Sequence, residues 1–253
     1  MFKPFQEHSY GYRTYSRNIV LLDMKQGDVT GDGIMDYIYL YGNKQSETDI
    51  FADNITLVIQ DGRSNHVSTI NLQNNAGYNA KLFLGDFSKD NILDIFVSIE
   101  SGGSGGYGFF YIYSFRNSVP LKLFDFENYN NDYKFEVIYE DFYKVSVVDH
   151  SLGVFFTLDI SYKGYDYLSQ IYDVNGKLKN PVRGEVLALG ILNPIVTNVN
   201  STNYDLLAYQ RIIGTSNADT LGYIENLLSW DGTQFTSSRL TTAILGTKLI
   251  RLY

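Results

Sequence analysis

The chain has 253 residues, 44% of them hydrophobic and 15% aromatic, so it can bury a full core and is not a disordered chain. Its 28 acidic against 20 basic residues give a formal net charge of −8, which opposes nucleic-acid binding and leaves no polybasic membrane anchor. The sequence has no cysteine and no apolar run of about 18 residues, which excludes disulfides, thiolate sites and a membrane-spanning helix.

Short strands are predicted along the chain. The first residues, MFKPFQEHSYGYR, lack the apolar run of a signal peptide, so we expect a cytoplasmic protein or a mature form cut from a precursor. Hydrophobic segments then alternate with Gly, Asn, Asp or Ser clusters, which is typical of strands and turns. These segments are 37–41, 55–60, 109–115, 154–160, 206–213 and 223–230. No amphipathic helix of three turns is predicted, so the expected fold class is all-β.

The loop GDVTGDGIMDYIYLYG at 27–42 gathers three aspartates before a strand. Carboxylates this close repel one another unless a cation offsets their charge. Calcium takes oxygen ligands from alternate positions of such a loop, and the seventh position supplies its backbone carbonyl. The predicted Ca²⁺ ligands are Asp28, Thr30, Asp32, Ile34 and Asp36. Gly33 permits the sharp turn. The other interpretation is an Asp/Gly turn without a metal.

A second loop, GDFSKDNILDIFVS at 85–98, matches the first position for position about 58 residues later. Asn91 replaces the glycine and tolerates a left-handed conformation. Position twelve is Tyr39 in the first loop and Val97 in the second, which excludes an EF-hand. The predicted Ca²⁺ ligands of this loop are Asp86, Ser88, Asp90, Ile92 and Asp94. A weaker loop at 198–205 is expected to be a turn without metal.

Turns recur at a similar interval after hydrophobic strands, at 59–62, 113–117, 171–176 and 229–232. The loops and turns together predict four repeat units, 19–76, 77–131, 132–188 and 189–238. A unit of this length holding four short strands is typical of a propeller blade, so we expect one β-propeller of four-stranded blades over 1–253. The terminal segments 10–16 and 241–253 either close the ring or build a composite blade, which allows four or five blades. A β-sandwich is the alternative.

The loops DVTGDGIMD and DFSKDNILD resemble the D-x-[DNST]-x-[DN]-G-x-x-D calcium loops of FG-GAP or VCBS repeat proteins, the β-propeller family that includes the blades of integrin α-subunit heads. This resemblance implies that each loop joins the first and second strands of a blade and holds calcium. It is specific in the first loop, good in the second and weak in the other two units. It also implies an extracellular or cell-surface setting, where weak calcium sites are filled.

Other motifs do not predict catalysis. The segment SGGSGGYGFF at 101–110 is followed by neither a lysine nor a helix, so it is not a phosphate loop, and we expect it to cross the propeller face. The histidines have no metal-ligand spacing, and no serine lies in a G-x-S-x-G motif. These histidines are His8, His66 and His150.

The expected function is a calcium-stabilised, monomeric binding or scaffold module without catalysis, whose partner is a protein or a carbohydrate. Tyr107, Tyr165 and Tyr167 lie near glycine-rich turns, where they either line such a contact or pack between blades. The alternative is a carbohydrate-active enzyme, a glycosidase or lyase, which needs two carboxylates about 5–10 Å apart in a central cleft.

Overall fold

The structure is a computed structural model that describes residues 18–46 and 48–246. It consists of β-strands and a few short helices, which confirms the predicted all-β class. The segment 10–16, which the sequence predicts to help close a ring, lies outside the described residues, as do residues 247–253.

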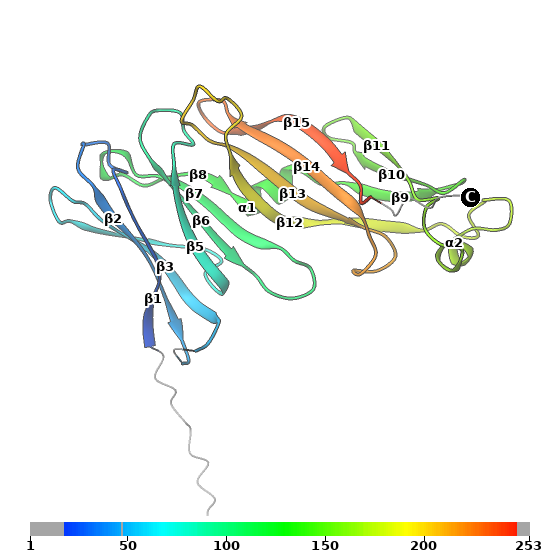
Figure 1. Ribbon diagram of the computed structural model, residues 1–253, viewed down its shortest axis with the longest axis horizontal. Coiled ribbons are helices and arrows are strands. Elements are labelled where there is room, and N and C mark those ends of the chain that lie inside the picture. The colour runs from blue at the N-terminus through cyan, green and yellow to red at the C-terminus, as the bar shows by residue number, and fades with distance from the viewer. Residues whose placement is uncertain (1–17, 47, 247–253) are drawn as a thin grey trace, which may run out of the picture.

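The amino-terminal half forms an eight-stranded antiparallel sheet in the order β1-β2-β3-β5-β6-β7-β8, with β4 paired to β3 (Figure 1). Its strands are β1 (Asn18–Gly27), β2 (Asp36–Lys44), β3 (Phe51–Gln60), β4 (Val67–Asn71), β5 (Gly77–Gly85), β6 (Asp94–Glu100), β7 (Gly108–Ser114) and β8 (Leu121–Asp125). Strands β1 to β4 and β5 to β8 form two meanders. The meanders join where Phe51 pairs with Tyr78 and Ala52 with Gly77.

The carboxy-terminal half forms a seven-stranded antiparallel sheet in the order β11-β10-β9-β12-β13-β14-β15. Its strands are β9 (Glu136–Glu140), β10 (Lys144–Asp149), β11 (Val154–Asp159), β12 (Arg183–Ile195), β13 (Asp205–Ile213), β14 (Thr220–Trp230) and β15 (Phe235–Ala243). Helix α1 (Phe126–Asp132) links the two sheets, and the Asp125 side chain caps it by accepting a hydrogen bond from the Glu127 amide. Helix α2 (Tyr165–Ile171) lies between β11 and β12.

Alternation of side chains explains why these segments are strands. In β2, Ile38 and Leu40 are fully buried, whereas Tyr37, Tyr39 and Tyr41 face the other side of the sheet. A period of two is the pattern of a sheet with one face on a core. The three tyrosine rings stack along the outer face, with centroids 6.4 Å and then 5.8 Å apart.

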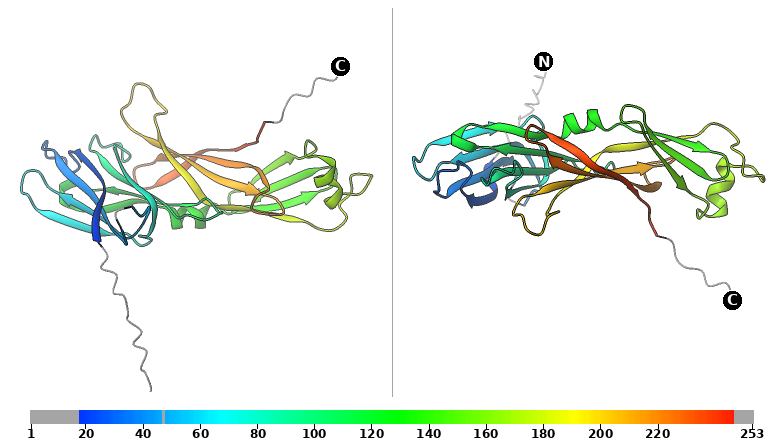
Figure 2. Two further views of the ribbon diagram at one scale, coloured as in Figure 1. Left: turned by 60° about the horizontal axis from the view of Figure 1, so that its bottom comes forward. Right: turned by 90° about the horizontal axis from the view of Figure 1, so that it is seen from above.

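One hydrophobic core crosses from the first sheet to the second. It contains Leu57 and Ile95 of the first sheet and Leu189 and Leu206 of the second. A second core, around Val147, lies at the far end beside α2. The views in Figure 2 show the result, an elongated body with β1 to β5 at one end and α2 at the other.

The predicted propeller ring is therefore not what the structure shows, although four-stranded meanders are present. Meanders join edge to edge, because β3 pairs with β5 and β9 pairs with β12. Blades of a propeller contact their neighbours through faces and keep their edges separate. Here the strand edges satisfy one another instead, which produces two long sheets and not a ring.

The predicted repeat units relate to these elements in different ways. Unit 19–76 covers most of β1 and all of β2 to β4, and unit 77–131 covers β5 to β8. Unit 132–188 holds β9 to β11 and α2. Its boundary with unit 189–238 falls inside β12, which is one continuous strand of 13 residues.

Candidate functional site

The first aspartate loop is a hydrogen-bonded turn. The Asp28 carboxylate accepts hydrogen bonds from the amides of Gly31 at 2.7 Å and Gly33 at 2.8 Å. Both glycines have positive φ, +80° and +85°, which places their amides toward the carboxylate. Asp36, which is fully buried, accepts hydrogen bonds from the amides of Val29 and Thr30 through Oδ2.

An arginine supplies the positive charge in this loop. Arg63 Nε lies 2.6 Å from Asp32 Oδ2, and Arg63 Nη2 donates to the Asp32 carbonyl at 2.6 Å. Gly62, in the same turn, donates its amide to Asp36 Oδ1 at 2.9 Å. The turn after β3 therefore covers the loop between β1 and β2. The positive charge of the guanidinium offsets the negative charge of the crowded carboxylates, a role that the sequence pattern predicts for calcium.

The second loop repeats this geometry. Asp86 accepts from the amides of Asp90 and Asn91, both at 3.1 Å, and Asn91 has a φ of +64°. Asp94 Oδ2 accepts from the amides of Phe87 at 2.9 Å and Ser88 at 2.7 Å. Arg116, in the turn after β7, lies 3.2 Å from Asp90 Oδ2. The matching sequences thus fold into matching loops.

In the second sheet, a lysine likewise pairs with an aspartate in the loop between two strands. Lys177, in the turn before β12, lies 2.9 Å from Asp141, which stands between β9 and β10. Lys89 of the second aspartate loop lies 3.0 Å from Asp205 at the start of β13. The main chains of Asp86 and Asn203 form an isolated bridge beside this pair. The loop at 198–205, expected to be a turn without metal, thus joins the two sheets.

These contacts give the predicted calcium loops partners within the chain. The loop carboxylates are engaged by backbone amides and arginines, while Ile34 lies with its side chain partly exposed. In the part of the chain that the structure describes, no group of three or more His, Asp or Glu residues is placed to hold a metal ion. Binding of Ca²⁺ itself stays a prediction, which a titration tests.

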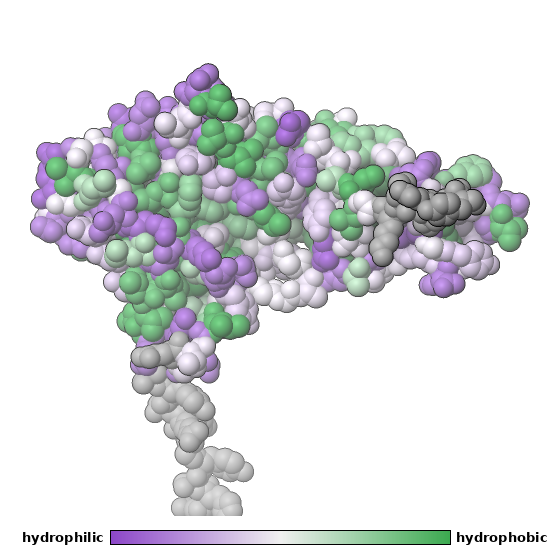
Figure 3. All heavy atoms as spheres, viewed as in Figure 1, coloured by the Kyte–Doolittle hydropathy of each residue, from purple (hydrophilic) through white to green (hydrophobic). Residues whose placement is uncertain are grey.

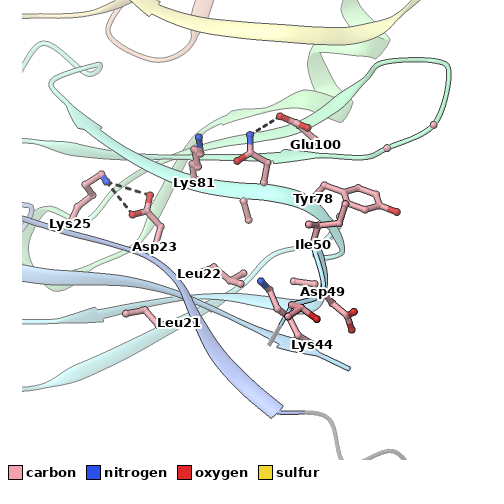
Figure 4. A pocket seen from close by; sticks show the side chains of 17 residues that line it. Leu21, Leu22, Asp23, Lys25, Lys44, Asp49, Ile50, Tyr78, Lys81 and Glu100 are labelled. Carbon is pink, nitrogen blue, oxygen red and sulfur yellow. Dashed lines mark hydrogen bonds and ion pairs between the residues drawn. The ribbon is translucent and has the colours of Figure 1, made fainter. Parts of the chain in front are cut away.

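A large cavity lies away from both loops, between β1 and β5 (Figure 4). It is a cleft of about 1090 Å³. Its walls come from β1, β2, β5, β6 and the segments after β2 and β6. The residues that we use below are Leu21, Asp23, Lys25, Lys44, Asp49, Ile50, Tyr78, Asn79, Lys81, Glu100 and Gly102.

Asp23 closes the narrow end of the cleft. Its Oδ2 accepts a hydrogen bond from the Leu82 amide of β5 at 2.8 Å, and its Oδ1 lies 3.1 Å from Lys25 Nζ. Burial alone raises the pKa of Asp23, but the hydrogen bonds from Leu82 and Lys25 outweigh it and hold the pKa below its ordinary value. Asp23 is therefore ionised at neutral pH and fixed in place.

The open end of the cleft carries exposed apolar side chains together with lysines and carboxylates. Leu21 and Ile50 are 51% and 77% exposed. Figure 3 shows hydrophobic side chains gathered over this end of the molecule, beside the start of β1. Neither Lys44 nor Lys81 has an ion-pair partner among the residues that the structure describes. Glu100, in contrast, accepts a hydrogen bond from Asn79 Nδ2 at 2.7 Å.

The glycine-rich segment predicted to cross a propeller face instead borders this cleft. Gly102 has a φ of +78°, and a Cβ there would lie 2.4 Å from the Tyr78 ring, so glycine makes room for the tyrosine. The far side of the same loop reaches the second sheet, where Arg211 donates to the Ser104 carbonyl at 3.0 Å. Sequence reasoning missed the cleft because its residues come from separate strands and form no motif.

The remaining residues singled out in the sequence lie elsewhere. Tyr107 and Tyr165 are 42% and 82% exposed and line other, smaller hollows. Tyr167 donates to Asp219 Oδ2 at 2.6 Å within a partly buried polar network. His150 lies near Glu136, and His66 is exposed in the turn before β4. His8 lies outside the described residues.

The fold and the cleft define an all-β protein of two joined antiparallel sheets with one large open cleft in the first. The YybI C-terminal domain model matches residues 133–243, which cover the second sheet. The uncharacterized protein YybI of Bacillus subtilis (strain 168) is 41% identical over 243 residues, which is 96% of this chain and 92% of the relative. The chain therefore belongs to the YybI family. No solved structure matches it.

This family assignment corrects the resemblance to FG-GAP and VCBS repeat proteins, which is wrong. The matches are to the YybI family, and no calcium-loop repeat family is among them. The misleading signal is physical, because Asp and Gly at these spacings also form tight turns in which carboxylates accept backbone amides. Among the described residues, no helix is long and apolar enough to span a membrane.

Proposed function

We propose that the protein is a binding module without catalysis of its own, and that it takes its ligand in the cleft between β1 and β5. The observation that carries this proposal is the cleft itself, about 1090 Å³ with an apolar mouth and two lysines that have no ion pair among the described residues. Ligand sites are concave and combine apolar walls with a few polar groups. The secreted or cell-surface setting and the monomeric state, both expected from the sequence, belong to the same proposal.

The titratable groups with the most unusual surroundings do not face this cleft. Asp94 is fully buried in its loop. Lys163 pairs with Asp219 at 2.5 Å in the second sheet, and Tyr167 completes that network. Burial, together with the hydrogen bonds to Asp219 and to Tyr139, raises the pKa of Tyr167 far above its ordinary value. A phenol held neutral in this way fits packing and not acid–base chemistry near pH 7.

The second candidate is a carbohydrate-active enzyme, because Asp23, Asp49 and Glu100 share the cleft. Glycoside hydrolysis needs one carboxylic acid that stays protonated and one carboxylate. Asp23 has a lowered pKa, which suits it poorly as the acid. The chemistry of the cleft therefore favours binding.

A paired assay separates the two candidates. Fluorescently labelled protein is applied to a phage-displayed peptide library and to a glycan array, and the same protein is incubated with the array polysaccharides in a reducing-sugar assay. We expect binders that are lost in Ile50→Ser, without release of reducing sugars. The matched control is Val174→Ser, since Val174 is 98% exposed and lies in the turn between α2 and β12, away from the cleft lining. Sugar release that Glu100→Gln abolishes would overturn the proposal.

A further inference from the structure

We infer that the ligand of the cleft is an extended peptide, which adds as a strand to the free edges of β1 and β5 and places acidic side chains on Lys44 and Lys81. This inference rests on the proposed function, because it names the ligand of the same cleft. It follows from three features of the cleft walls, which are their free backbone edges, their bulges and their unpaired charges.

The first feature is a pair of free strand edges. Strand β1 pairs with β2 on one side and with no strand on the other, among the residues described. Strand β5 pairs with β6, and with β3 only at Gly77 and Tyr78. Among the described residues, the hydrogen bond from the Leu82 amide to the Asp23 carboxylate is the one that joins the two edges. Free edges carry main-chain donors and acceptors that an extended chain satisfies.

The second feature explains why the two strands separate. The register of β1 shifts between Leu21 and Asp23, and that of β5 shifts between Tyr78 and Lys81. Bulges bend a strand away from its neighbour. Asn79, in the second bulge, has a φ of +47°. Figure 4 shows that β1 and β5 diverge from Asp23 toward the end of the cleft that holds Tyr78 and Ile50. The cleft therefore opens where both β1 and β5 have a bulge.

The third feature is the charge of the cleft. Asp23 is paired with Lys25, Glu100 is bonded to Asn79, and Asp49 Oδ2 accepts the Ser46 amide. Neither Lys44 nor Lys81 has a carboxylate within ion-pair distance among the described residues. In a chain of net charge −8, these two lysines, which have no ion pair among the described residues, are the groups of the cleft that fit acidic side chains of a ligand. The exposed side chains of Leu21 and Ile50 accept the apolar residues that alternate with acidic ones along a strand.

The aromatic side chain of the cleft argues against a carbohydrate. Sugars stack on an open aromatic face, but the Tyr78 ring packs edge to face with Phe51, with centroids 5.3 Å apart, and its other contact is Gly102. The tyrosine is thus part of the wall. A peptide needs no aromatic platform, because its main chain provides most of the contacts.

The test uses three fluorescein-labelled octapeptides and fluorescence anisotropy with the full-length protein. The first alternates valine and glutamate, the second alternates valine and lysine, and the third is the first with two prolines at its centre. We expect the valine–glutamate peptide to bind at least tenfold more tightly than the other two, because it alone has both the charge and the strand-forming amides. Added salt should weaken binding of the valine–glutamate peptide, because salt screens its attraction to the lysines.

Variants and hydrogen exchange locate the binding. Lys44→Glu and Lys81→Glu should each weaken binding of the valine–glutamate peptide by about tenfold, whereas Lys134→Glu, at an exposed position outside the cleft, should not. Thermal melting confirms that each variant is folded. Bound peptide should protect amides of 18–27 and 79–84 from exchange.

Equal binding of the proline-containing peptide, or no change in either lysine variant, would overturn the inference. Absence of peptide binding together with a glycan that depends on Lys44 and Lys81 would overturn it too, but would leave the binding function of the cleft standing. Failure of both ligand classes would remove the proposed function as well.

Discussion

Asp36 and Asp94 occupy the same position in two matching loops, but their carboxylates are satisfied to different degrees. Asp36 accepts three backbone amides, two from its own loop and one from Gly62. Asp94 accepts two, from Phe87 and Ser88, and its Oδ1 has no hydrogen-bond partner among the described residues. Burial raises the pKa of Asp94 to about 6, and the two amides only partly offset that effect.

Removing the first of these carboxylates should be costly. We expect Asp36→Ala to lower the free energy of unfolding by about 3 kcal/mol, because three amides lose their acceptor in a buried place. Urea denaturation followed by tyrosine fluorescence measures the change. Asp132→Ala, at the exposed end of α1, is the matched control and should change stability little. Equal effects of the two substitutions would show that the loop is not organised by Asp36.

The second carboxylate predicts a pH dependence. Since the pKa of Asp94 is about 6 in the folded chain and lower in the unfolded chain, the folded state binds more protons between about pH 4 and pH 6. Stability should therefore fall as the pH rises through this window, by at most about 3 kcal/mol from this group. Asp94→Asn should flatten the slope. Urea midpoints at intervals of pH test it, and an unchanged slope would contradict the raised pKa.

At the scale of elements, a loop and the turn that covers it form one unit. The turn after β3 brings Gly62 and Arg63 onto the loop between β1 and β2, and the turn after β7 brings Arg116 onto the next loop. Exposed arginine–carboxylate pairs contribute little to stability by themselves. The close approach of the turn backbone to the loop backbone constrains the unit more strongly, because a Cβ on Gly62 would lie 2.0 Å from the Met35 carbonyl oxygen.

A substitution at that glycine tests the close approach. We expect Gly62→Ala to destabilise the protein by about 2–4 kcal/mol, since the added methyl group forces the turn off the loop. Gly164→Ala is the control, because a Cβ there meets nothing within 4 Å and its effect should stay within about 0.5 kcal/mol. Thermal melting gives both values. A tolerated Gly62→Ala would mean that the turn is free to move.

The same units bear on the calcium prediction, because their carboxylates have partners within the chain. With carboxylates bound to amides and to Arg63 and Arg116, 10 mM calcium chloride should leave the melting temperature where it is in EDTA. A ligand that binds only the folded state raises stability by RT ln(1 + [L]/Kd), so even millimolar binding would be visible. Magnesium chloride at equal ionic strength is the control. A rise specific to calcium would support the ligands predicted from the sequence.

At the scale of the molecule, the two sheets depend on each other. Leu189, Leu192 and Leu206 of the second sheet lie in the core of the first, and the rings of Phe124 and Phe235 meet edge to face with centroids 6.0 Å apart. The family model, however, begins at residue 133, after the first sheet. The segment that the family model covers therefore shares its core with the first sheet.

A fragment tests this dependence. Residues 133–243 alone would expose the leucines that the first sheet covers, so we expect the fragment to unfold at a lower denaturant concentration than the same segment in the whole chain, or to aggregate. Limited proteolysis and circular dichroism of the fragment and the whole protein provide the comparison. A fragment as stable as the whole protein would show that the second core suffices.

The sequence by itself determined the all-β class, the strands and the paired loops, because alternation and turn residues act locally. It also located the turns that cover these loops. Only the tertiary structure decided the rest, namely that Arg63 faces Asp32, that meanders join at their edges and do not close a ring, and that a cleft opens between β1 and β5. Each of these depends on contacts between residues that are far apart in the sequence, and the spacing of residues along the chain does not predict such contacts.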